Sequence, residues 1–356
     1  MPASIIHGPG KNEKGRLLKF MKPVYVIPLM VALLLFGYLY SRTFYAVNTF
    51  TYTHMTMDTV VELRFQAPGV RAAEEIRDKV FDEIERLEKL FSRSIPGSDV
   101  VAVNEHAGQR AVKVSPEVFY VTDQALEFAE LSEGAFDPTV APLTDLWGFF
   151  SDYEYRVPDP EEIEDTLQLV NYTLVELDPN DQTIFLPLSG MGLELGGIAK
   201  GFIVDRTLEI LSEAGVENAF VNAGDIGLLG TRPDGEPWRI GVRNPRDQRD
   251  MIAVLPLKNK AVDTSGDYER AFEEDGIRYH HILDPETGMP AKALASVTVI
   301  AATTMEADVL STAAFVLGPE KGFELIEALP AVDGIFVTPD LEITYTSGLE
   351  DSIEME

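Results

Sequence analysis

The sequence contains no cysteine. This absence excludes disulfide bonds, thiolate metal sites, cysteine nucleophiles and a lipid-modified N-terminal cysteine, while it leaves the redox compartment open. Basic residues are also scarce, since 29 Lys and Arg stand against 59 Asp and Glu for a net charge of −30. A surface this acidic repels phosphate backbones unless a basic patch is set apart, and the sequence shows none. We therefore expect no nucleic-acid partner.

The rest of the composition is that of a folded protein. The chain has 356 residues, of which 45% are apolar and 25% charged. This is enough for one large or two ordinary domains with a substantial core, and it excludes disordered and fibrous classes.

An uncharged apolar run extends from Pro23 to Ser41. The twelve residues before it, 11–22, contain five basic residues. At about 1.5 Å per residue a helix over this run crosses a hydrocarbon core of about 30 Å. The segment through Arg42 holds six basic residues and one acidic residue, whereas the remainder holds 23 basic and 58 acidic residues, a net charge of −35. By the positive-inside tendency we predict a cytoplasmic basic segment over residues 1–22, a single-pass anchor over 23–41 and an acidic body outside the cytoplasm.

Two alternatives to the anchor remain at this level. The run is also compatible with a buried core helix. A cleaved signal peptide is the stronger rival, although the bulky residues that end the run contain no convincing small-x-small cleavage site.

No repeat or low-complexity linker interrupts the remainder, so we predict a single catalytic body over about residues 50–350. The alternation of Thr59–Phe65 predicts a strand, and helical spacing of apolar residues predicts a helix over Ala73–Phe91. Further strands are predicted at Trp238–Arg243, Met251–Leu257, Ser296–Ala301 and Gly334–Thr338, and further helices from Pro116 to near Gly134 and at Gly197–Ala214, Met305–Leu317 and Pro319–Leu329. Strands and helices alternate without a strict βαβ rhythm, which favours an α+β fold over a doubly wound sheet.

Five short stretches carry residues suited to chemistry: GAFDPT (134–139) with Trp147 nearby, LELGGIAKG (193–201), VNAGDIG (221–227), TSGDYE (264–269) followed by HHILDPETG (280–288), and ADVLST (307–312). Taken singly, most have an ordinary structural interpretation. The aromatic residues of the first stretch suit either a planar ligand or the core. VNAGDIG by itself reads as a tight turn after a strand.

Two of these stretches suggest specific chemistry. Lys200 lies just after a Gly-Gly pair at a predicted helix start, which suits a phosphate group, although the Walker spacing is absent. Asp308 and Thr312 are four residues apart, so on a helix their oxygens share one face and are able to chelate a hard cation. The alternative for this pair is an exposed Asp beside a core-facing Thr. Two of only five histidines, His280 and His281, stand together beside an Asp-Pro turn, where imidazole chemistry is plausible.

In order and spacing, these stretches resemble the FAD:protein FMN transferase family, also called the ApbE-type flavin transferases, over about Met57 to Gly318. The resemblance implies a mixed sheet with helices of the ApbE or T-fold-like type. It implies an enzyme that uses Mg²⁺, takes FAD as substrate, transfers FMN to a Thr or Ser hydroxyl of an acceptor protein and releases AMP. It also implies residence at the outer face of the bacterial cytoplasmic membrane, with the body on the periplasmic side, and acceptors such as subunits of Na⁺-pumping NADH:quinone reductase (Nqr) or Rnf.

The resemblance assigns roles to individual residues. His281 matches the histidine that activates the acceptor hydroxyl, and Asp308 and Thr312 match the side-chain Mg²⁺ ligands, joined by the carbonyl of Gly197. The residues that match FAD contacts are Met57, Ala135, Phe136, Asp137, Glu194 and Lys200.

Three positions depart from the family pattern. Glu194 replaces the usual Asp, Ser94 stands where an aromatic often contacts the flavin, and the run Asn222 to Asp225 is one Gly short. The first two affect FAD affinity and flavin stacking rather than the reaction class.

Two other functions remain open from the sequence. Water in place of the acceptor hydroxyl makes a Mg²⁺-dependent FAD pyrophosphatase that yields FMN and AMP. A membrane-anchored flavin-binding protein without turnover is the non-enzymatic alternative, but such a carrier needs neither the histidine nor the cation ligands.

Overall fold

The computed structural model describes residues 28, 30–31, 48–150, 155–247 and 249–356. The predicted basic segment over 1–22 lies outside these residues, as does the predicted anchor over 23–41 apart from positions 28, 30 and 31. None of the helices in the described part is both long and apolar enough to span a bilayer. Residues Thr49–Glu356 form one compact unit.

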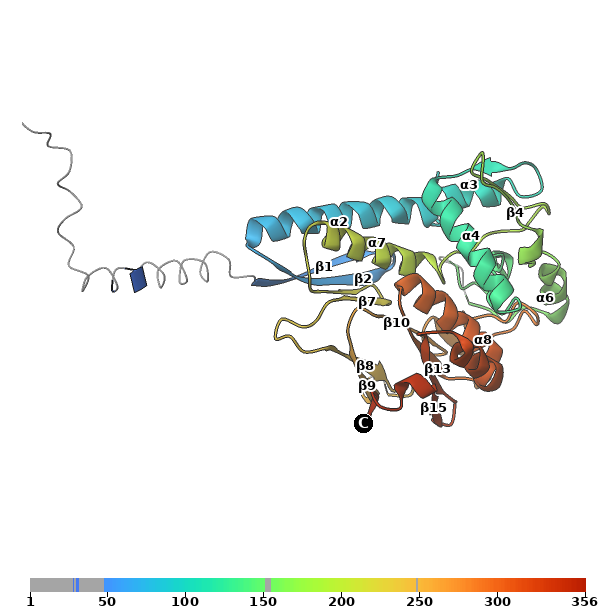
Figure 1. Ribbon diagram of the computed structural model, residues 1–356. Coiled ribbons are helices and arrows are strands. Elements are labelled where there is room, and N and C mark those ends of the chain that lie inside the picture. The colour runs from blue at the N-terminus through green and yellow to red at the C-terminus, as the bar shows by residue number, and fades with distance from the viewer. Residues whose placement is uncertain (1–27, 29, 32–47, 151–154, 248) are drawn as a thin grey trace, which may run out of the picture. The chain divides into compact units, whose positions relative to one another are not determined.

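A sheet of eight strands forms the centre of this unit, in the order β1-β2-β6-β7-β10-β13-β14-β15 (Figure 1). From β2 to β15, each strand pairs antiparallel with the next one in this order. The strands are β1 Asn48–Thr56, β2 Thr59–Ala67, β6 Ala219–Asn222, β7 Ile226–Leu229, β10 Ala261–Gly266, β13 Ser296–Ala301, β14 Asp333–Val337 and β15 Ile343–Tyr345. The mixture of this sheet with helices is the predicted α+β class.

Both faces of the middle of the sheet are covered. Three long helices, α2 (Val70–Phe91), α7 (Ala199–Glu213) and α8 (Thr304–Ala328), pack against one another and against one face (Figure 1). A small sheet packs against the other face; its strands are β8 Trp238–Arg243, β9 Met251–Leu257 and β16 Glu354–Met355. The central strand β13 is therefore buried along its whole length, as expected for a strand covered on both sides.

The remaining elements lie around one end of the helices or at the rim of the unit. They are α3 Asp99–Glu105, β3 Val112–Lys113, α4 Pro116–Leu131, α5 Ala141–Leu146, α6 Pro160–Leu167, η1 Tyr172–Leu174, β4 Glu176–Asp178, β5 Thr183–Phe185, β11 Ala271–Glu274, β12 Ile277–His280 and η2 Ser347–Leu349.

Local chemistry explains several helix boundaries. Ser115 caps α4 by accepting the Val118 N–H, and Pro116 occupies the first turn, where its missing N–H costs nothing. The chain leaves α7 through Gly215, which has φ +80°, a conformation that favours glycine. Gly318, with φ 81° and ψ −175°, separates α8 into the two helical parts predicted from the sequence.

Candidate active site

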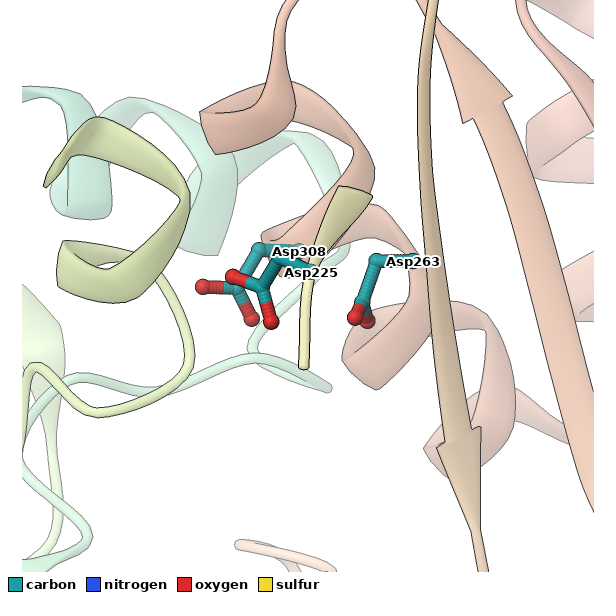
Figure 2. Close-up of side chains that lie close together, drawn as sticks. All are labelled: Asp225, Asp263 and Asp308. Atoms are coloured by element: carbon teal, nitrogen blue, oxygen red, sulfur yellow. The ribbon is translucent and has the colours of Figure 1, made fainter. Parts of the chain in front are cut away.

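Three buried aspartates meet where the sheet contacts α8. Asp225 follows β6 and directly precedes β7, Asp263 lies within β10, and Asp308 lies near the start of α8. β7 and β10 are neighbours, and α8 packs on β10, so the fold brings the three carboxylates together. One oxygen from each lies within 4.8 Å of the others. Figure 2 shows Asp225 and Asp308 side by side, with Asp263 on the adjacent strand.

Lys200 supplies one positive charge to this aspartate cluster. Its Nζ lies 2.6 Å from Asp225 Oδ1, and its side chain keeps 35% exposure. Burial alone would lower the pKa of Lys200, but the three carboxylates together raise it, so the ammonium remains charged. Burial, together with the neighbouring Asp225, raises the pKa of Asp263 to about 7 despite Lys200, and burial likewise raises the pKa of Asp308. The raised pKa values mean that Asp263 and Asp308 hold a proton more strongly than separate carboxylates do.

The predicted cation ligands lie beside the aspartate cluster. Asp308 is only 3% exposed, so the alternative of a solvent-exposed carboxylate at this position is wrong. A methyl group added to Gly197 would lie 3.5 Å from Thr312 Oγ1 and 3.3 Å from Phe136 Cε2, which places the Gly197 backbone against the face of α8 that carries Thr312. A carboxylate, a hydroxyl and a backbone carbonyl are the hard oxygen donors that Mg²⁺ prefers, so the donor set fits this ion.

A buried arginine organises the loop that leads to Gly197. The Arg93 side chain is 6% exposed; it donates to Glu194 Oε2 at 2.6 Å and to Asp145 Oδ1 at 2.7 Å. Its guanidinium carbon lies 4.0 Å from the centre of the Phe150 ring. Glu194 Oε1 in turn accepts the Gly196 N–H at 2.8 Å. Glu194 therefore has a local structural role in addition to any contact with FAD, and Arg93 is a residue that the sequence motifs did not indicate.

The first motif has a mainly structural role in the described contacts. Asp137 is buried, and it accepts the Thr139 N–H and Oγ1–H on one oxygen and the Tyr172 N–H on the other. Trp147 is fully buried and donates from Nε1 to the Gly288 carbonyl at 2.8 Å. Trp147 therefore packs in the core and holds the loop after His281, and the interpretation of this tryptophan as a ligand wall is wrong.

The other predicted FAD contacts differ in their surroundings. Ala135 is half-buried beside Phe136, which is 5% exposed and reaches Gly197. Met57 lies at the tip of the β1–β2 hairpin, where its N–H donates to Glu88 Oε1 at 2.8 Å. It lines an open cavity of about 520 Å³ together with His54 and Glu88. The described contacts of Met57 thus join it to α2 and not to the aspartate cluster.

The two histidines have different environments. His280 is 3% exposed; its Nε2 donates to the Ala291 carbonyl at 2.6 Å and its Nδ1 accepts the Ile282 N–H. His281 is partly buried, and its Nδ1 donates to the Glu269 carbonyl at 3.2 Å. This tautomer leaves Nε2 of His281 with a free lone pair. His280 is therefore a structural clamp, whereas His281 presents a base.

Burial lowers the pKa of His281 to about 3, and the positive charges of Arg270 and Lys200 act in the same direction. The lowered pKa keeps His281 unprotonated at neutral pH, and it also makes the free imidazole a weaker base than an ordinary histidine.

We expect the His281 imidazole to stay neutral from pH 8 to pH 5, because its pKa lies far below the ordinary value of about 6.5. The folding free energy that this shift contributes is present above pH 6.5 and is lost as the pH falls toward 3. ¹⁵N spectra of histidine-labelled protein will show an Nδ1–H tautomer throughout this range, and the His281→Asn spectrum assigns the signals. A ring that titrates near pH 6.5 would contradict the assignment of a free base.

The chain matches the ApbE family model over residues 57–336. It is 36% identical to an FAD:protein FMN transferase of Klebsiella pneumoniae over 84% of this chain and 92% of the relative. It is 35% identical to that of Treponema pallidum, over 78% of this chain and 81% of the relative. Among solved structures, the ApbE protein of Thermotoga maritima superposes with a TM-score of 0.80 at 37% identity, covering 86% of this chain and 99% of that one. The flavin transferase ApbE of Vibrio cholerae has a TM-score of 0.78 at 29% identity, with the same coverage of both chains. Since the family model covers most of the chain and the matches extend over nearly the whole length of these relatives, the protein belongs to the ApbE family of flavin transferases.

Proposed function

We propose that this FAD:protein FMN transferase attaches FMN to a Thr or Ser hydroxyl of an exported protein, that it releases AMP and that it requires Mg²⁺. The observation that carries the proposal is His281, whose Nδ1–H is held by the Glu269 carbonyl so that its Nε2 keeps a free lone pair. A protein that only binds FAD needs no such base. The relatives from Treponema pallidum and Klebsiella pneumoniae are FAD:protein FMN transferases, which supports FMN transfer as the class of reaction.

The FAD-binding part of the proposal rests on Lys200, Glu194, Met57 and the segment from Ala135 to Asp137. Lys200 supplies a positive charge that is able to bind the pyrophosphate, because its ammonium remains protonated and its side chain keeps 35% exposure. Asp308, Thr312 and the Gly197 carbonyl would hold Mg²⁺. When bound there, this ion neutralises the pyrophosphate charge that otherwise repels a nucleophile.

The transfer step then follows from the geometry of His281. The acceptor oxygen attacks the phosphorus on the FMN side of FAD, and the phosphoanhydride bond to AMP breaks. The hydroxyl proton passes to Nε2 of His281, while Nδ1–H stays hydrogen-bonded to the Glu269 carbonyl. The product is FMN joined to the acceptor through a phosphoester bond, and AMP leaves with the former bridging oxygen.

The partner and the location also belong to this proposal. The acceptor is a subunit of a membrane redox complex of the Nqr or Rnf type, and residues 23–41 anchor the enzyme in the cytoplasmic membrane with its body on the periplasmic side. The sequence supports this arrangement, since residues 1–42 hold six basic residues and one acidic residue, whereas the remainder carries a net charge of −35.

We expect the anchor to stay attached, so that the full-length protein fractionates with membranes and resists extraction by high salt. An uncharged run of this length inserts as a helix because its side chains are apolar and its backbone satisfies its own hydrogen bonds. The measurement is membrane fractionation followed by N-terminal sequencing. Recovery of a soluble mature form that begins near Ala46 would show cleavage instead.

The function is tested by incubating the protein with FAD, Mg²⁺ and a candidate acceptor domain, followed by intact-mass analysis. Transfer adds the mass of FMN less water to the acceptor and releases AMP in equal amount. Free FMN and AMP without a mass change in an acceptor that carries its hydroxyl would favour the pyrophosphatase alternative.

A further inference from the structure

We propose that Arg93 is a positioning residue for the reaction, which sets the affinity for FAD by holding Glu194 against the Gly196–Gly197 segment. This role rests on the proposed function, in which FAD and Mg²⁺ bind beside that segment. Arg93 acts on FAD through a neighbouring side chain and makes no contact with the ligand itself.

The guanidinium of Arg93 is enclosed by the chain. The side chain is only 6% exposed, and the Phe150 ring covers the planar group at 4.0 Å. One terminal nitrogen donates to Glu194 Oε2 at 2.6 Å and to Thr144 Oγ1 at 2.9 Å. The other donates to Asp145 Oδ1 at 2.7 Å. Two carboxylates therefore balance the single positive charge, and the burial of the group keeps it away from a ligand.

Glu194 transmits this restraint to the backbone. Its Oε1 accepts the Gly196 N–H at 2.8 Å, while its Oε2 is held by Arg93. A methyl group added to Gly196 would lie 2.8 Å from the same Oε1, so the carboxylate is folded over this residue. Both oxygens of Glu194 thus bond within the chain, and the carboxylate links the guanidinium to the loop.

The Gly196–Gly197 pair is the part of the loop that needs this restraint. Before the pair, the Glu194 N–H is fixed by the Pro138 carbonyl at 2.8 Å. After it, α7 begins at Ala199. Glycine has the greatest backbone freedom of all residues, so a side chain that fixes the pair narrows its conformations. Because the carbonyl of Gly197 is a predicted Mg²⁺ ligand, displacement of the pair weakens the binding of FAD together with its ion.

The geometry around residue 93 suits arginine and not lysine. Glu194 and Asp145 bond to different nitrogens of one rigid plane, and Phe150 stacks on that plane. A lysine ammonium is a single point charge without a face for stacking. Arg93→Lys therefore keeps the charge but loses the simultaneous hold on both carboxylates.

The competing explanation is direct attraction between the charge of Arg93 and the phosphates of FAD. The two explanations predict opposite results for Glu194→Gln. Under direct attraction, the loss of the negative partner leaves the guanidinium less neutralised and tightens FAD binding. Under positioning, the same change loosens the Gly196–Gly197 pair and weakens FAD binding.

The test is a titration of the full-length protein with FAD in the presence of Mg²⁺ and without acceptor, followed by flavin fluorescence. We expect affinity about tenfold weaker in Arg93→Gln, Arg93→Lys and Glu194→Gln, because each breaks a charged hydrogen bond. The double variant Arg93→Gln/Glu194→Gln should bind no more weakly than the single variants, since both changes break the same link. In transfer assays, KM for FAD should rise by more than the rate at saturating FAD falls.

Arg156→Gln is the matched control. Arg156 also donates two hydrogen bonds to a glutamate, Glu162 Oε2 at 2.7 Å and Oε1 at 3.0 Å, but both side chains are exposed. This variant should bind FAD like the parent. Circular dichroism establishes that each variant is folded, and if Arg93→Gln does not fold, Arg93→Lys and Glu194→Gln decide the question.

Three outcomes would overturn the positioning role. A folded Arg93 variant binds FAD as tightly as the parent, or Glu194→Gln binds it more tightly, or the loss in the double variant equals the product of the two single losses. Each of these leaves FMN transfer by the parent untouched. A parent that binds FAD but labels no acceptor would instead refute the proposed transfer and leave the role of Arg93 in FAD binding intact.

Discussion

Asp308→Ala is expected to lower the rate of FMN transfer by more than about 10³-fold while the protein remains folded. Asp308 belongs both to the predicted Mg²⁺ ligands and to the buried cluster, so the variant loses the carboxylate that ties a cation to α8. Such an ion supplies several kcal/mol of charge stabilisation to phosphoryl transfer. The measurement is the rate at which the acceptor protein gains the mass of FMN less water at a saturating concentration of FAD.

The fold should survive this change because it also removes a source of repulsion. Three carboxylates crowd one lysine, and burial already raises the pKa of Asp308, so the charged form is disfavoured in the parent. The cost is one hydrogen bond from the Gly201 N–H. Thermal melting in chelator-treated buffer will show a transition close to that of the parent.

Thr312→Ala provides the comparison. Thr312 contributes a neutral oxygen, and its hydroxyl also lies 3.3 Å from Ser265 Oγ. Excess Mg²⁺ should restore Thr312→Ala more readily than Asp308→Ala, because the first variant loses a ligand and the second loses a ligand and a charge. Full transfer activity of Asp308→Ala after chelator treatment would end the cation-based interpretation.

Local sequence signals predicted the elements with strong periodicity. Ile76, Val80, Ile84 and Leu87 are buried on α2 as their helical spacing indicated. The start of α4 at Pro116, the end of α7 near Ala214 and the division of α8 at Gly318 also agree with the predicted bounds, because each depends on the chemistry of a few neighbouring residues.

Weakly apolar elements were harder to predict. The β11–β12 hairpin carries Glu273 and Glu274 and lacks a clear alternation of apolar residues. Its turn contains Asp275 and Gly276 at φ 50° and 75°, and an Asp-Gly pair between two short runs is a strong hairpin signal. That signal was present, although the acidic residues around it obscured the strands.

The aspartate cluster shows what a linear sequence does not contain. Asp225 lies in a stretch that reads as a turn, and Asp263 lies in β10, directly before the TSGDYE stretch. Their meeting with Asp308 depends on β7 pairing with β10 and on α8 packing against that strand. The same limit applies to Arg93, whose partners Asp145 and Glu194 are distant in the chain. The order of the motifs along the chain therefore indicated the reaction. The charges that meet in the site became known only from the three-dimensional structure.

His281→Ala is expected to bind FAD but to label the acceptor about 10²–10⁴-fold more slowly, the usual cost of losing a positioned general base. The structure supports this expectation in two ways: Nδ1–H is held by the Glu269 carbonyl, and burial keeps Nε2 unprotonated. His281 also precedes the turn-rich segment from Asp284 to Pro290, in which Glu286 and Thr287 are exposed, and we expect an extended acceptor segment to approach there. The fluorescent product should survive denaturing electrophoresis and carry the mass of FMN less water.

A control for His281→Ala has to separate the lost base from a disturbed loop. His280→Ala removes the clamp between the Ala291 carbonyl and the Ile282 N–H, so we expect it to lower the melting temperature, and its loss of rate should follow its loss of folded protein. His281→Ala should melt like the parent and should regain rate at high pH, where hydroxide removes the acceptor proton without an imidazole. If His281→Ala labels the acceptor at the parent rate at pH 7, the proton leaves by another route and the assignment of His281 as the base is wrong. If the parent releases AMP together with free FMN and the acceptor gains no mass, water is the nucleophile and the pyrophosphatase alternative replaces transfer.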